Sequence, residues 1–88
     1  MNRQSYTVYP RRAIFDHTLT AGARLLYGVI FTDAMDTGYC CATNQYLGDC
    51  IRVSPDRAST YVSELVRHDY VRRELGDGGE RRLYPLVT

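Results

Sequence analysis

Arginine and small hydroxyl side chains gather between residues 52 and 67. All eleven basic residues of the 88-residue chain are arginines. The planar guanidinium fork of arginine suits phosphate and guanine better than the ammonium of lysine does. The candidate donor side chains of the segment are Arg52, Ser54, Arg57, Ser59, Thr60, Ser63 and Arg67. Side chains of these types can contact phosphates and base edges.

The composition limits the classes of protein to which the chain can belong. Hydrophobic residues are 44% and charged residues 24%, so a folded domain is expected rather than disorder. The length suits one domain. The formal net charge is only +1, which is low for an isolated nucleic-acid-binding domain. No apolar run approaches the roughly 20 residues of a membrane span, and no signal peptide begins the chain, so we expect a cytoplasmic protein.

The cysteines and histidines do not indicate a metal site. Cys40, Cys41 and Cys50 are odd in number, and adjacent cysteines of an extended segment point to opposite faces. Neither His17 nor His68 has zinc-finger spacing. We expect all three cysteines to be buried as small apolar residues. Without a nucleophile motif or a phosphate-binding loop, the sequence predicts no enzyme and no cofactor.

Apolar spacing and capping residues predict three helices. The first spans about 20–35 and begins at a Thr20 N-cap. The second spans about 44–50, with Thr43 or Asn44 as its cap. The third spans about 55–68, because Ser54 and Pro55 form a strong helix start. Its apolar residues recur at helical spacing and are Ala58, Tyr61, Val62, Leu65 and Val66.

Strand-like segments flank the predicted helices. Residues 70–85 predict a hairpin around a glycine-rich turn, and residues 6–9 suit a short edge strand. Residues 39–42 are expected to be extended, and residues 11–15 to form one helical turn. A short helix, a tight turn and a longer amphipathic helix make a helix-turn-helix, and the hairpin adds a wing. The predicted fold class is α+β, mainly α: a single winged helix-turn-helix domain over residues 1–88, with a three-helix core and a C-terminal β-hairpin wing.

The same segments resemble a known family. Leu19–Gly28 resembles the first helix of winged helix-turn-helix domains in phage and plasmid replication initiators (replisome organisers). Gly38–Leu47 resembles the family's entry into its second helix, and Arg81–Pro85 resembles its wing. The resemblance implies the DNA-recognition domain of an initiator or of a small transcriptional regulator. Asp69 stands where the family usually has glycine, and we expect it to adopt a left-handed backbone conformation.

A helix-turn-helix inserts its second helix into the major groove. Arg57 is therefore predicted to read guanine, while small hydroxyl side chains allow a close approach to phosphates. Glu64 is expected on the same polar face. The alternative is a solvated face on which Arg57 pairs with Asp56 or Glu64.

Neighbouring residues of a hairpin face opposite sides, so about two of the four wing arginines are expected to reach DNA. The others would pair across the strands with Glu74 or Glu80. Thr43 and Asn44 can offer backbone N–H groups to a phosphate or act only as caps. The predicted DNA-binding set is Thr43, Asn44, Arg52, Ser54, Arg57, Ser59, Thr60, Ser63, Arg67, Arg72, Arg73, Arg81 and Arg82.

These patterns predict sequence-specific binding of double-stranded DNA. The alternative is a winged-helix protein–protein interaction module without DNA binding, which the low net charge favours. The partners consistent with these interpretations are DNA, a second copy of the chain, and a replication or regulatory protein. Dimerisation is expected because duplex sites commonly have two-fold symmetry.

Overall fold

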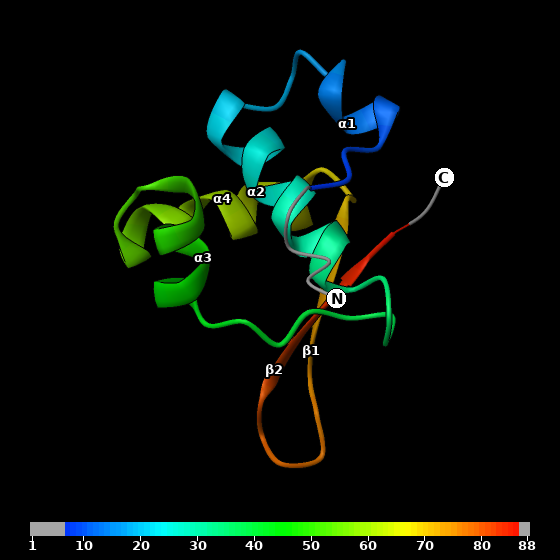
Figure 1. Ribbon diagram of the computed structural model, residues 1–88, viewed down its shortest axis with the longest axis vertical. Coiled ribbons are helices and arrows are strands. Elements are labelled where there is room, and N and C mark those ends of the chain that lie inside the picture. The colour runs from blue at the N-terminus through cyan, green and yellow to red at the C-terminus, as the bar shows by residue number, and fades with distance from the viewer. Residues whose placement is uncertain (1–6, 87–88) are drawn as a thin grey trace.

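The computed structural model describes residues 7–86, which form an α+β arrangement of helices followed by an antiparallel hairpin. The helices are α1 (Arg11–Ile14), α2 (Ala21–Asp33), α3 (Asn44–Ile51) and α4 (Pro55–Arg67), and the strands are β1 (Val71–Leu75) and β2 (Arg81–Pro85). Figure 1 shows α1 at one end of the molecule and the turn of the hairpin at the other. None of the helices within residues 7–86 has the length and apolar character needed to cross a bilayer.

Hydroxyl caps begin the three longer helices at the predicted places. The side-chain oxygens of Thr20, Thr43 and Ser54 each accept the backbone N–H three residues further on, at 3.1–3.3 Å. Thr43, rather than Asn44, is the N-cap of α3. Each of these bonds satisfies a donor that a helix start leaves free, so short polar residues determine where the helices begin.

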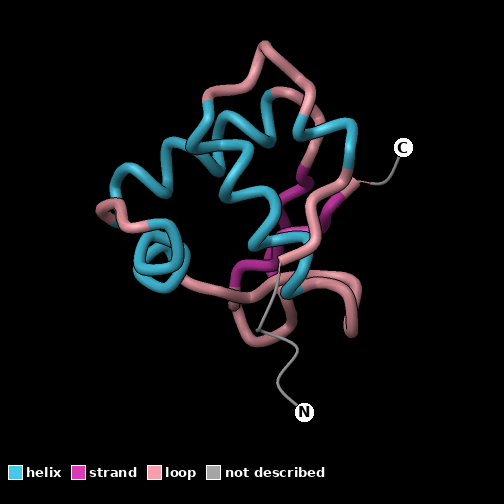
Figure 2. Tube along the Cα trace, turned by 45° about the horizontal axis from the view of Figure 1, so that its top comes forward, coloured by secondary structure: helices cyan, strands magenta, loops and turns pink. Residues whose placement is uncertain are grey.

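The core lies among α2, α3, α4 and the hairpin (Figure 2). Each element contributes fully buried side chains, namely Leu26, Ile30, Leu47, Val62, Leu65 and Leu83. The predicted apolar stripe of α4 faces this core: Ala58, Val62 and Leu65 are fully buried, and Tyr61 and Val66 are partly buried against it. Burial of such side chains contributes roughly 1.5–3 kcal/mol each for the larger aliphatic residues, which anchors α4 by one side.

The hairpin pairs β1 with β2 in antiparallel register, with Arg73 opposite Leu83. Cys40 extends this pairing, because its N–H and C=O both bond to the backbone of Leu83 at 2.9 Å. Asp69, just before β1, has a φ of 64°, which confirms the expected left-handed conformation. The expectation for the cysteines is only partly correct. Cys40 is buried, whereas Cys41 and Cys50 are exposed.

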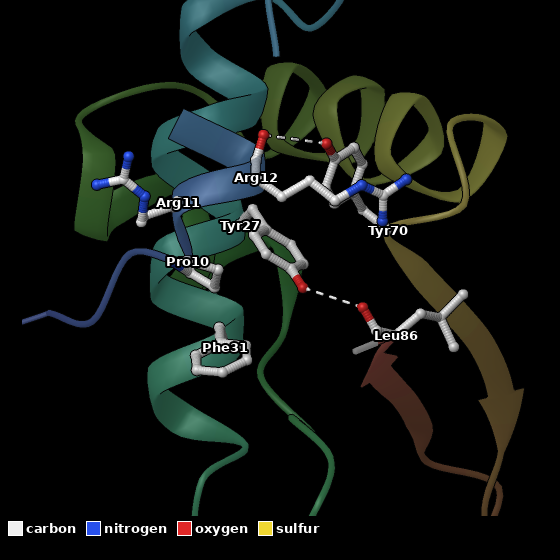
Figure 3. Close-up of a pocket in the computed structure, with 7 residues that line it drawn as sticks. All are labelled: Pro10, Arg11, Arg12, Tyr27, Phe31, Tyr70 and Leu86. Atoms are coloured by element: carbon white, nitrogen blue, oxygen red, sulfur yellow. Dashed lines mark hydrogen bonds between the residues drawn. The ribbon is translucent and has the colours of Figure 1, made fainter. Parts of the chain in front are cut away.

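The N-terminal segment differs from its prediction. Residues 7–9 form no strand, and residue 6 lies outside the described part of the chain. The reason is that Val8 donates its N–H to the hydroxyl of Thr32 at 2.8 Å, so a side chain of α2 takes the place of a strand partner. The single turn expected at 11–15 is present as α1. Figure 3 shows the hydroxyl of Tyr70 directed at the carbonyl oxygen of Arg12, 3.3 Å away, which helps to hold α1 on the core.

The turn between α3 and α4 is tight at Gly48. A Cβ at Gly48 would lie 2.6 Å from the carbonyl oxygen of Val53, closer than real Cβ contacts occur. The N–H of Val53 in turn bonds to the carbonyl oxygen of Gly48 at 2.9 Å. Arg52 closes the turn in a left-handed conformation with a φ of 64°. The path of the backbone from α3 into α4 therefore depends on the absence of a side chain at Gly48.

Gly48→Ala is expected to lower the free energy of unfolding by about 2 kcal/mol, because the new methyl group meets backbone that cannot move aside cheaply. Urea denaturation followed by circular dichroism would measure the loss. The matched control is Gly78→Ala in the hairpin turn, where the nearest atom is a flexible carboxylate oxygen of Glu80 at 3.2 Å. The control should stay within about 0.5 kcal/mol of the wild type. Equal effects of the two variants would contradict the close approach at Gly48.

Asp16 makes the stability of the fold depend on pH under acidic conditions. Hydrogen bonds from the side chain of Thr18 and then of Tyr70 lower the pKa of Asp16 from 3.8 to about 2. The Tyr70 hydroxyl donates to this carboxylate at 2.7 Å. Because the folded pKa is depressed, the stabilisation is fully present above the unfolded value of 3.8 and is lost as the pH falls towards 2.

Urea midpoints of the wild type should therefore fall between about pH 5 and about pH 2 more steeply than those of Asp16→Asn. Parallel pH profiles of the two proteins would contradict this role.

Candidate nucleic-acid interface

The side of α4 that faces away from the core is polar. We call it the outer face of α4, and it consists of Asp56, Thr60, Ser63 and Arg67. These residues are spaced by four, three and four positions, which places them on one side of a helix. Thr60 and Arg67 are exposed, Ser63 is half-buried, and Ser59 is half-buried at the margin of this face. Of the predicted hydroxyl side chains of the third helix, Thr60 is therefore exposed to solvent, whereas Ser59 and Ser63 are partly covered.

Arg57 lies in the first turn of α4 and is exposed. Its Nη1 lies 3.5 Å from the hydroxyl of Tyr61, one turn further along the helix. Neither Asp56 nor Glu64 forms an ion pair with it among the described residues. The guanidinium is therefore available to an external acceptor, unlike in the alternative in which it is neutralised by a neighbouring carboxylate.

Glu64 is not on the polar face where we expected it. It is buried, with 7% of its surface exposed, and it contacts the start of α2. Its two carboxylate oxygens accept the backbone N–H of Thr20 at 2.7 Å and the Thr20 hydroxyl at 2.8 Å. A carboxylate is favoured there because the N-terminus of a helix carries a partial positive charge. The α2–α4 contact thus removes one negative charge from the surface that faces solvent.

Two of the wing arginines are neutralised within the hairpin. The Nε of Arg72 lies 2.6 Å from Glu74, and the Nε of Arg82 lies 2.9 Å from Glu80. We expected pairs across the strands, but each pair joins residues two apart in the sequence: Arg72 and Glu74 lie on β1, and Glu80 lies just before β2, which contains Arg82. The reason is that residues two apart on a strand share a face and lie within reach of an arginine side chain.

The same two arginines stack on tyrosines. Arg72 lies over the ring of Tyr84 at 4.6 Å, and Arg82 lies over the ring of Tyr39 at 4.5 Å. The two tyrosine rings are themselves 5.5 Å apart. Four side chains thus form a continuous stack from β1 across β2 to the segment before α3. Stacking of this kind contributes to the stability of the hairpin rather than leaving the charges free.

Arg81 joins the wing to the start of α3. Its Nη1 donates to the side-chain oxygen of Asn44 at 2.8 Å, and its Nη2 donates to the carbonyl oxygen of Ala42 at 2.8 Å. Burial lowers the pKa of the Arg81 guanidinium below its usual range. Both predicted DNA contacts, Arg81 and Asn44, are therefore bonded to each other. Together they fix the orientation of the hairpin relative to α3.

The remaining arginines share a different environment. Among residues 7–86, four arginines are exposed and take part in no ion pair and no stacking contact: Arg52, Arg57, Arg67 and Arg73. They come from the turn before α4, its first turn, its last turn and β1. A helix of this length spans about 20 Å. The unpaired positive charges thus lie near the two ends of α4 and on β1.

Comparison of the chain with protein-family models, with curated proteins and with solved structures gives no match. The function is therefore inferred from how the arginine and hydroxyl side chains of α4 and the hairpin are arranged.

Arg81→Ala is expected to lower the free energy of unfolding by about 2 kcal/mol, because it leaves two buried or half-buried acceptors without a charged donor. The control is Arg73→Ala, which removes an exposed arginine of the same hairpin and should stay within about 0.5 kcal/mol of the wild type. Thermal unfolding of the two variants would separate a structural arginine from a free one. The interpretation of Arg81 fails if both variants unfold at the wild-type temperature.

Proposed function

We propose that the protein is a winged helix-turn-helix domain that binds double-stranded DNA in a sequence-specific manner. The observation that carries this proposal is that Arg52, Arg57, Arg67 and Arg73 are exposed and take part in no ion pair among the described residues, while Glu64 is buried against the start of α2. The net charge of +1 sums over the whole chain and does not distinguish these four arginines from Arg72 and Arg82, which are paired with Glu74 and Glu80.

In the proposed complex, α4 enters the major groove, whose width of about 12 Å accommodates a helix. Arg57 reads a guanine through O6 and N7 from the first turn, as N-terminal residues of recognition helices do. Thr60 and Ser63 bring the helix close to the bases, and Ser54 and Ser59 bond to phosphates at the groove edge. Their short side chains leave room for the backbone of α4 to approach the duplex.

Phosphate contacts at both ends of α4 complete the proposed interface. Arg52 would contact the backbone near the start of the helix, and Arg67 near its end. On the wing, Arg73 is assigned to a flanking phosphate, whereas Arg72, Arg81 and Arg82 stiffen and position the hairpin. This division of the wing arginines follows from the ion pairs and hydrogen bonds described above.

The resemblance noted in the sequence favours a DNA-recognition domain of a phage- or plasmid-type replication initiator or of a small regulator. Two copies on a palindromic site would double the number of base contacts. The alternative is an interaction module without DNA binding. The net charge of +1 and the carboxylate of Asp56 on the outer face of α4 favour this alternative.

A salt titration of duplex binding tests the proposed function. The duplex would come from a randomised pool, selected by the protein for its preferred site. Phosphate contacts from Arg52, Arg67 and Arg73 predict that log K falls against log salt with a slope of about −3 for each bound domain. No binding to any duplex at about 50 mM salt would contradict DNA recognition and support the interaction module.

Arg57→Ala should lose about 1–3 kcal/mol of binding free energy on the selected site and much less on an unrelated duplex, because it removes a base contact. Arg67→Ala should weaken binding to both duplexes equally and reduce the salt slope by about one unit. The control is Arg72→Ala, whose charge is already paired with Glu74. Fluorescence anisotropy with both duplexes would measure the effects. Equal losses for Arg57→Ala on the two duplexes would reassign Arg57 to a phosphate.

A further inference from the structure

A second surface of the molecule is apolar and exposed. It lies where α1 meets the first half of α2, and we call it the α1–α2 patch. Its residues are Tyr9, Ile14, Phe15 and Leu25, which are 36%, 42%, 60% and 48% exposed. In Figure 1, α1 lies at the end of the molecule remote from the turn of the hairpin. Four large apolar side chains are thus left uncovered close together, and such a patch commonly marks an interaction site.

The α1–α2 patch is concave. A hollow of about 390 Å³ opens between Tyr9, Ile14, Ala21, Arg24 and Leu25. Its size is within the roughly 300–1,000 Å³ typical of ligand sites. Because four of its five lining residues are apolar or aromatic, it suits a large apolar side chain better than a polar group.

The walls of the hollow are fixed before anything binds. The ring of Tyr9 lies on Gly28 of α2, where a Cβ would come within 2.2 Å of it. The neighbouring Val8 is bonded to the Thr32 hydroxyl, which holds the segment along α2. A preformed wall reduces the conformational entropy that binding would otherwise cost.

Positive charge borders the hollow. Arg24 lines it, and its Nη1 donates to the backbone carbonyls of Asp16 and Leu19 at 3.0 and 2.9 Å, which leaves its charge uncompensated. Arg11 lies over the ring of Phe15 at 5.3 Å. The carboxylate of Asp16 is already bonded to the hydroxyls of Thr18 and Tyr70.

We propose that the α1–α2 patch binds an acidic amphipathic helical segment of a protein partner. An apolar side chain of the segment fills the hollow, and a carboxylate beside it contacts Arg24, which lines the hollow. A second carboxylate contacts Arg11, which lies over the ring of Phe15 and also lines the second hollow described below. This is the helix-in-groove mode of recognition, in which the apolar anchors supply affinity and the charges supply specificity.

The charges argue against the other occupants. A second copy of the chain would bring the same arginines against one another across a two-fold axis. Residues 1–6 of the chain itself carry Arg3 and no acid, so they do not complement the border either. A flat lipid surface would leave the hollow unfilled.

A second hollow, on the other side of α1, is less suited to a partner. It measures about 240 Å³, and Figure 3 shows that the hydroxyls of Tyr27 and Tyr70 are directed at carbonyl oxygens of Leu86 and Arg12 across it. The guanidinium of Arg12 lies over the ring of Tyr70 at 4.6 Å. The side chains around this hollow are therefore engaged with one another.

The α1–α2 patch shares no residue with the outer face of α4. On α2, Gly22 packs against α4, because a Cβ there would meet the ring of Tyr61, and Leu25 lies one turn further along and is exposed. The proposal therefore holds whether or not the protein binds DNA.

Titration with synthetic peptides, followed by ¹⁵N NMR, tests the proposal. The probe is a helical peptide of about 15 residues with leucines at i, i+4 and i+7 and glutamates beside them. It should bind with a Kd on the order of 100 µM and shift the amide signals of Ile14 and Leu25. A second peptide with lysines in place of the glutamates should bind at least about tenfold more weakly. Equal binding of the two peptides would overturn the proposal.

Leu25→Ser should weaken binding of the acidic peptide by at least tenfold, which corresponds to about 1.4 kcal/mol. The matched control is Met35→Ser, which changes a 58% exposed apolar residue just beyond the other end of α2 and should bind as the wild type does. Equal losses for the two variants would overturn the assignment of the site. Self-association that Leu25→Ser abolishes would instead assign the patch to a second copy. Binding to phosphatidylglycerol vesicles that this variant abolishes would assign it to a lipid surface.

Discussion

Burial of one side of α4 is the constraint on which the rest of the molecule depends. Ala58, Val62 and Leu65 are fully buried, whereas Asp56, Thr60 and Arg67 on the opposite side are exposed. The start of α2 packs beside this stripe. There the backbone N–H and the hydroxyl of Thr20 donate hydrogen bonds to the buried carboxylate of Glu64. Hydrophobic burial thus determines which residues form the outer face of α4. The contact between Thr20 and Glu64 keeps one carboxylate away from solvent.

The arginines show why net charge is a poor guide to the surface of so small a protein. The net charge of +1 for 88 residues does not distinguish two groups of arginines that differ in their contacts. Arg72 and Arg82 are paired with glutamates and stacked on tyrosines, whereas Arg52 and Arg67 have no such contacts among residues 7–86. Local potential, rather than total charge, governs the encounter with a polyanion.

The sequence was sufficient to predict the parts of the fold that depend on local chemistry. Hydroxyl caps and apolar spacing placed the starts of α2, α3 and α4, because both signals act within one or two turns of helix. Contacts between distant residues were not predictable. No local pattern indicates that Glu64 caps a helix 44 residues away, or that Arg81 bonds to Asn44. Cys50 was wrongly expected to be buried, because its small apolar side chain does not reveal which side of α3 is covered.

The contact between α2 and α4 also relates the two proposed surfaces. Gly22 allows α2 to lie directly against the ring of Tyr61, and the hydroxyl of Tyr61 is 3.5 Å from Arg57. The α1–α2 patch lies on the same helix, one turn further along at Leu25. Close-packed interiors transmit strain, so a displacement of α2 would be felt at α4 through this contact. Residues that hold α2 against α4 should therefore affect both surfaces, whereas those exposed on only one of them should not.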